Sequence, residues 1–315
     1  MITALINALP LMLYYLLSNF FSALSNTLGV FLVKNDFFPI DSSQMMDLFL
    51  HCDVWNFVFF IILYSFKRQR GQIDFTFKET FFHKEELVQL FLFALPVIAA
   101  CYKTYMMGFI NISNIAISAM IKPFLVWFLA VILLHEKFNK NYIFYSSFAI
   151  LGFVLTNYSK LHVNYIYFLT SYVLIASFGD VTRRYYCRQR KNTMQAICAE
   201  CLVFFIYCVI IMSIRGTFDL KLLFNPYTIL ISFLTFSHHV CLIHGVKKAS
   251  SVVALEFVNF SKTIFTLIFS FILLHDVPTL NKFIGVILIV ISIILFHKEE
   301  RKVKAQLLNE GKKNT

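Results

Sequence analysis

Two lysines lie inside apolar segments that are long enough to cross a membrane. Lys122 belongs to SAMIKPFLVWFLAVILLHEKF, and Lys262 belongs to NFSKTIFTLIFSFILLHDVP, 140 residues later. In both segments, Leu-Leu-His followed by an acid comes at the same distance after the lysine. An ammonium group at bilayer depth costs about 3 kcal/mol or more, so a mid-span lysine usually has a function. Two such lysines could bind an anionic group, a carboxylate or a phosphate.

Polar residues near these lysines are candidates for the same site. Asn114 and Ser118 precede Lys122 in steps of four, which places the three residues on one face of a helix. Asparagines in other apolar segments could supply further hydrogen bonds. We therefore predict these substrate-binding residues: Lys122, Lys262, Asn259, Asn114, Ser118, Asn19 and Asn26. The alternative is that the asparagines and serines only join helices through hydrogen bonds.

Three acids in apolar segments are candidates to balance charge or to couple protons: Glu200, Glu256 and Asp53. Pairing of a lysine with Glu200 or Asp53 across helices would form a structural ion pair. Glu256 and Lys262 are six residues apart, about 120° around a helix, so they do not face each other. We favour an anionic substrate group as the partner of the lysines.

The composition is that of an integral membrane protein. Hydrophobic residues make up 59% of the 315 residues and charged residues 14%, whereas about a quarter of the residues of a soluble domain are charged. The apolar segments are continuous, which predicts an all-α protein rather than a β-barrel. The seven cysteines lack metal-ligand or disulfide spacing, and motifs of enzymes are missing, so we expect no metal, no cofactor and no catalysis.

Ten helices are predicted from the apolar segments and their polar boundaries. Their ranges are 10–33, 45–66, 87–105, 111–134, 141–157, 163–182, 194–213, 227–246, 250–274 and 280–297. The offset between the two lysines divides the chain into five-helix repeats at 1–160 and 161–297, followed by a basic cytoplasmic tail at 298–315. Because five is odd, the second repeat enters the membrane from the opposite side. Such inverted repeats place a substrate site near the midplane.

The distribution of Lys and Arg predicts the orientation. Most of these residues fall in alternate loops, Arg183 and Arg184 among them, and such loops are cytoplasmic by the positive-inside rule. The opposite loops hold few cations, among them Lys103. Both termini are then cytoplasmic. Asp47 and Asp180 lie near the ends of predicted helices, so we expect them at the membrane interface. The net charge of +11 follows from this topology and from attraction to anionic lipids, and it requires no nucleic-acid partner.

The pattern of proline, acid and glycine resembles the repeat of the drug/metabolite transporter superfamily, EamA type. The matching residues are Pro123, Glu136 and Gly152 in the first half and Asp276, Pro278 and Gly285 in the second. The second half departs from the pattern because it has Thr263 at the position of the proline. The resemblance implies a secondary transporter that moves a small polar metabolite by alternating access.

The residues and the resemblance together favour an anionic or zwitterionic substrate. A polar-lined channel and a membrane scaffold without transport activity are the alternatives. The expected partners are a small-molecule metabolite and membrane lipid, and the chain is expected to be a monomer or a homodimer. We expect a bacterial inner (plasma) membrane, or alternatively a eukaryotic organelle membrane.

Overall fold

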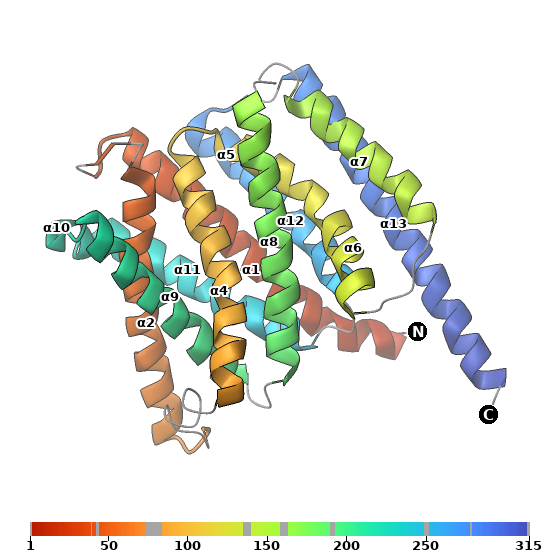
Figure 1. Ribbon diagram of the computed structural model, residues 1–315, viewed down its shortest axis with the longest axis horizontal. Helices are drawn as coiled ribbons and strands as arrows, with labels where there is room; N and C mark the ends of the chain where they lie inside the picture. The colour runs from red at the N-terminus through yellow and green to blue at the C-terminus, as the bar shows by residue number, and fades with distance from the viewer. Residues whose placement is uncertain are drawn as a thin grey trace.

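Helices make up nearly all of the structure, a computed structural model (Figure 1). It describes residues 2–38, 40–41, 44–73, 84–134, 140–157, 163–189, 193–248, 252–277 and 279–313. These residues contain no β-strand. The chain is therefore all-α over the described ranges, as predicted.

Each predicted range lies within helix to within a few residues, and α1 begins eight residues before its predicted start. The observed helices are α1 (Ile2–Lys34), α2 (Met45–Gln69), α4 (Lys84–Met107), α5 (Ile112–Ser118), the 3-10 turn η2 (Ala119–Ile121), α6 (Lys122–Leu134), α7 (Asn141–Asn157), α8 (Val163–Gln189), α9 (Thr193–Arg215), α10 (Leu220–Leu223), α11 (Pro226–Lys248), α12 (Val252–Leu274) and α13 (Leu280–Lys313). The short α10 was not predicted. Helices α8 and α13 continue past their predicted ends.

Five helical segments of the described chain are long and apolar enough to cross a membrane. They are Leu13–Lys34, Met45–Gln69, Ile112–Leu129, Thr193–Arg215 and Pro226–Lys247. Shorter apolar stretches occur in α7, α12 and α13. Large apolar side chains such as Ile62, Phe144 and Ile214 are exposed on the outside of the bundle. Such a surface suits a protein that is surrounded by lipid.

Helices at corresponding positions of the two halves have corresponding packing partners. Helix α1 packs against α11 and α12, and its counterpart α8 packs against α4 and α6. Helix α2 packs against α9, and α7 runs beside α13 at the edge of the bundle (Figure 1). These contacts of one half thus have counterparts in the other half with the partners exchanged.

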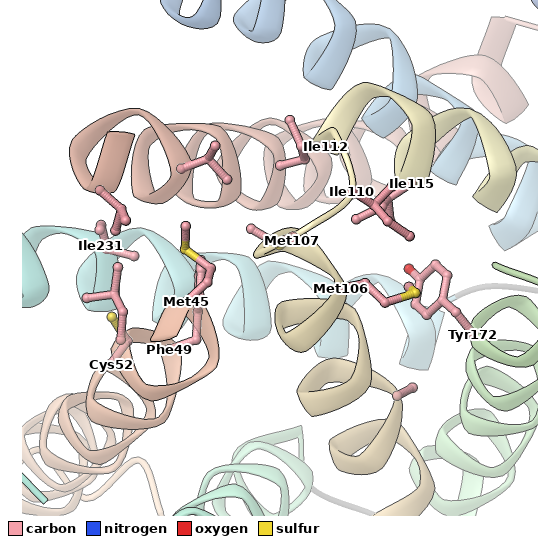
Figure 2. Packing of buried hydrophobic residues seen from close by; sticks show 14 of the residues in the cluster. Met45, Phe49, Cys52, Met106, Met107, Ile110, Ile112, Ile115, Tyr172 and Ile231 are labelled. Carbon is pink, nitrogen blue, oxygen red and sulfur yellow. The ribbon is translucent and has the colours of Figure 1, made fainter. Parts of the chain in front are cut away.

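An apolar cluster fills the end of the bundle where α2 begins and α4 ends. Figure 2 shows Met45 and Phe49 of α2 in this cluster, with Met106 beside the ring of Tyr172. A methionine sulfur against an aromatic ring is a favourable contact that fills irregular space. Phe49 and Tyr172 also line the polar cavities described below, so the cluster forms the wall of these cavities toward that end.

The two glycines of the sequence pattern account for the close packing of α7 on α13. A Cβ atom at Gly152 would lie 2.5 Å from the carbonyl oxygen of Gly285, closer than real side chains come. The hydroxyl of Ser292 donates to the carbonyl oxygen of Tyr145 across the same contact. Glycine at position 152 is therefore required by the approach of the two backbones.

Candidate functional site

The two matched lysines, Lys122 and Lys262, line one polar cavity of about 110 Å³. Asn19 and Asn26 line it as well, so the structure brings four of the predicted residues together. A second cavity of about 150 Å³ adjoins the first and shares both lysines and Asn26 with it. The predicted site is therefore a physical space between helices of both halves.

The helix that carries Lys122 is distorted immediately before that residue. Pro123 has no N–H to donate to the carbonyl oxygen of Ala119, four residues earlier. The N–H of Lys122 donates to that oxygen instead, which tightens Ala119–Ile121 into the 3-10 turn. In the second half α12 has Thr263 at this position and remains α-helical, and the Thr263 hydroxyl donates to the carbonyl oxygen of Ala116 at 3.1 Å.

Asn114 and Ser118 are not among the residues that line either cavity. Both are buried, and the Ser118 hydroxyl donates to the backbone carbonyl oxygen of Asn114 at 2.7 Å. The cause is the 3-10 turn, which rotates by about 120° per residue instead of about 100°. Over the three residues of the turn, the helix face that carries Asn114 and Ser118 shifts by roughly 60° relative to Lys122. Ile115 and Ala119 therefore face the cavity instead.

Lys122 forms an ion pair with Asp180 of α8. The other carboxylate oxygen of Asp180 accepts a bond from Arg183 Nη1 at 3.0 Å. Asp180 lines the cavity wall, and α8 continues beyond its predicted end to Gln189. The partner of Lys122 is thus neither Glu200 nor Asp53.

Glu200 balances an arginine rather than a lysine. Its side chain is 1% exposed, and its Oε1 accepts bonds from Arg183 Nη2 at 2.9 Å and from His239 Nδ1 at 3.0 Å. Lys122, Asp180, Arg183, Glu200 and His239 therefore form one continuous chain of charged and polar contacts across α6, α8, α9 and α11.

Asp53 lines the second cavity and contacts neutral groups. Its Oδ1 accepts from Asn56 Nδ2 at 2.6 Å, and its Oδ2 accepts from the thiol of Cys208 at 3.5 Å. Asp47, in the first turn of the same helix, is instead buried beside Arg215. Arg215 Nε and Asp47 Oδ1 are 3.2 Å apart.

Asn19 and Asn26 of α1 line the first cavity and also form hydrogen bonds. Asn19 Nδ2 donates to the Ser261 hydroxyl at 2.9 Å, which joins α1 to α12 at the cavity wall. Asn26 Nδ2 donates to the hydroxyl of Ser22 at 3.3 Å and lines both cavities. The side chains of the predicted residues Asn259 and Glu256 lie outside the described residues, as do Glu136 and Pro278 of the sequence pattern.

Asp276, the acid of the second repeated element, lies at the end of the bundle and not in the lysine cavity. Its carboxylate accepts a hydrogen bond from Ser113 at the start of α5 and lies 3.7 Å from Lys282 Nζ of α13. The acid therefore joins the two halves at the end of the bundle where the apolar cluster lies.

Two cations of the cavity were missed by sequence reasoning. Lys103 of α4 and Arg183 of α8 were both assigned to loops, yet both line the two cavities. Within the described part of the chain, Lys103 makes no hydrogen bond or ion pair. A usable signal was the apolar sequence on both sides of Lys103, which continues beyond the predicted end at residue 105.

Among the described residues, cations outnumber acids on the cavity surface. The first cavity is lined by the cations Lys103, Lys122, Arg183 and Lys262 and by the acid Asp180. The second cavity has the same charged residues and adds Asp53. Low-dielectric walls strengthen the field of such a group of charges.

Apolar helices around an internal polar cavity define an integral, multi-pass membrane protein that can hold a polar solute. Residues 163–297 match the EamA-like transporter family, which confirms the resemblance seen in the sequence. The second half of the chain is thus similar to a family of membrane transporters.

A comparison with solved structures agrees with this fold. A solved structure described only as "Crystal structure of protein" aligns with a TM-score of 0.60, over 93% of this chain and 97% of its own length. Its sequence is 11% identical, so the likeness concerns the fold alone. None of the curated proteins matches the chain significantly.

Proposed function

We propose that the protein is a secondary transporter that moves a small anionic or zwitterionic metabolite by alternating access. The substrate site would be the two adjoining cavities that Lys122 and Lys262 line. The observation that carries this proposal is the excess of cations on the cavity wall, contributed by α4, α6, α8 and α12. Lys103, Lys262 and Lys122 would hold the anionic group of the substrate. Asn19 and Asn26 would bind its neutral polar groups.

The exchanged packing partners of the two halves support a ten-helix inverted repeat. In such a repeat, α1 corresponds to α8 and α4 to α11, and the contact of α1 with α11 has its counterpart in the contact of α8 with α4. The lysine helices then approach the cavity from opposite sides of the membrane, as alternating access requires.

A carrier fits the geometry better than a channel. At the end of the bundle where α2 begins lie the apolar cluster of Figure 2 and the hydrogen bond between Ser113 and Asp276. A channel needs a continuous polar path, whereas a carrier needs a closed barrier on one side of its site in each state.

Uptake by purified protein in liposomes tests this function. The panel consists of labelled nucleotides, sugar phosphates, amino acids and S-adenosylmethionine, each with and without a pH gradient. A carrier gives saturable uptake that unlabelled substrate inside the liposome accelerates. Linear flux without this acceleration would identify a channel, and no flux of any compound would identify a scaffold.

The proposed topology places the start of α2 outside and its end in the cytoplasm. Trp55 Nε1 donates to the carbonyl oxygen of Leu223 at 2.8 Å, which holds α10 beside the first half of α2. A membrane-impermeant maleimide should therefore label the Lys221→Cys variant only from outside and the Arg70→Cys variant only from the cytoplasm. The native cysteines are buried or half-buried, and the unmodified protein is the control. Labelling of both variants from the same side would contradict the topology.

A further inference from the structure

Asp53 differs from the other acids of the helix bundle in its contacts. Asp180 contacts Lys122 and Arg183, Glu200 contacts Arg183 and His239, and Asp47 contacts Arg215. The described contacts of the Asp53 carboxylate are the neutral donors Asn56 and Cys208. The negative charge of this carboxylate is therefore not fixed by an ion pair among the described residues.

Asp53 also has access to the substrate space. It lies well inside α2 (Met45–Gln69) and lines the second cavity, whose wall also contains Lys103, Lys122 and Lys262. A proton from water can reach an acid that lines a cavity, whereas it cannot easily reach Glu200, which lines neither cavity and is 1% exposed.

Helices α4, α9 and α11, which pack against α2, carry charged or titratable groups near Asp53. Helix α9 contributes Glu200 and Cys208, α11 contributes His238 and His239, α4 contributes Cys101 and Lys103, and the far cavity wall carries Lys122, Asp180, Arg183 and Lys262. Glu200 already has Arg183 and His239 as partners. The cavity lysines are the groups that a substrate anion would occupy.

Occupancy of the lysines by an anion changes the balance of charge at Asp53. Asp53 lines the same cavity as the lysines. An anion bound to the lysines would repel a second negative charge at Asp53 and favour the neutral carboxylic acid. By linkage, a proton on Asp53 favours binding of the anion to the same extent. The two ligands therefore bind cooperatively.

We propose that Asp53 binds a proton that crosses the membrane together with the anionic substrate. The carboxylate takes the proton from water on the side to which the cavity is open, and it releases the proton to water on the other side after the anion has left. No bond other than the O–H bond of the carboxyl group forms or breaks. This inference rests on the proposed transport function and adds the coupled ion to it.

The test compares two transport modes in liposomes for the wild type and the Asp53→Asn variant. The probes are labelled inorganic phosphate, a sugar phosphate, a nucleotide and glutamate, with a pH-sensitive dye inside the liposomes. For one proton per substrate, an inward proton gradient of one pH unit drives about tenfold accumulation. We expect this accumulation and the internal acidification in the wild type. The Asp53→Asn variant should lose both and keep exchange of labelled for unlabelled anion at equal pH.

The Asp47→Asn variant is the matched control, since it alters an acid of the same helix that lies outside both cavities. It should keep pH-driven accumulation. Wild-type transport without acidification would overturn the coupling proposal and leave the transport function standing. Acidification by the Asp53→Asn variant equal to that of the wild type would also overturn the coupling proposal. Loss of both exchange and acidification in this variant, at an unchanged melting temperature, would overturn it as well. Absence of wild-type transport for all four probes would instead overturn the transport function and with it the coupling.

Discussion

Removal of Lys122 or of Lys262 is expected to lower the transport of an anion by about 10- to 100-fold. A hydrogen bond to a charged group contributes about 1.5–3 kcal/mol, and each 1.4 kcal/mol corresponds to roughly a factor of ten. The Lys122→Ala and Lys262→Ala variants should still insert into the membrane, because each removes a charge from an apolar helix. Initial uptake rates in liposomes, at matched amounts of protein, measure the effect.

The control for this experiment is Lys221→Ala, which removes an exposed lysine of α10. It should transport at the wild-type rate. Lys122→Ala leaves Asp180 with Arg183 as its partner, so the loss should be one of anion binding and not of folding. Wild-type uptake by both lysine variants would contradict the role of the cavity.

Replacement of Glu200 by Gln is expected to destabilise the protein by about 3–5 kcal/mol, because removal of one member of a buried ion pair leaves the other charge uncompensated. Arg183 and His239 both lose a charged partner in this variant. Thermal unfolding in detergent measures the loss.

The double variant Arg183→Met, Glu200→Gln should recover much of the stability that Glu200→Gln loses. It removes the pair together, and Asp180 keeps Lys122 as its partner. Glu299→Gln is the control, since Glu299 pairs with the exposed Lys302 in the tail and such surface pairs contribute about 0–1 kcal/mol. A melting temperature of Glu200→Gln equal to that of the wild type would contradict the buried network.

The sequence predicted the helices and the family correctly because both depend on the pattern of apolar residues. Lipid-facing helices must be apolar along their whole length, so the ranges are visible without knowledge of packing. Lys122 and Lys262 were also identifiable, since a charge in the middle of an apolar segment is rare. Gly152 was recognised as part of the pattern, although its role in the contact with α13 needed the structure.

The rest of the site could not be predicted because it depends on where helices end and how they rotate. Lys103 and Arg183 lie near the ends of apolar segments, where hydropathy does not separate a helix from a loop. Asp180 became a partner of Lys122 only through the extension of α8 and its packing against α6. The 3-10 turn before Lys122 rotated Asn114 and Ser118 away from the cavity, and a face drawn with 3.6 residues per turn does not include such a turn.

Pro123 is present in only one of the two halves, so the two halves cannot adopt equivalent conformations. Helix α6 starts after a 3-10 turn, whereas α12 is α-helical throughout and Thr263 ties it to the backbone of α5. In the proposed cycle, the inward-facing and outward-facing states would be related by two-fold symmetry only if the halves were identical. In that cycle the two states would differ in free energy, and the empty carrier would favour one of them. The apparent affinity for the substrate would then be lower from the side that the favoured state does not face.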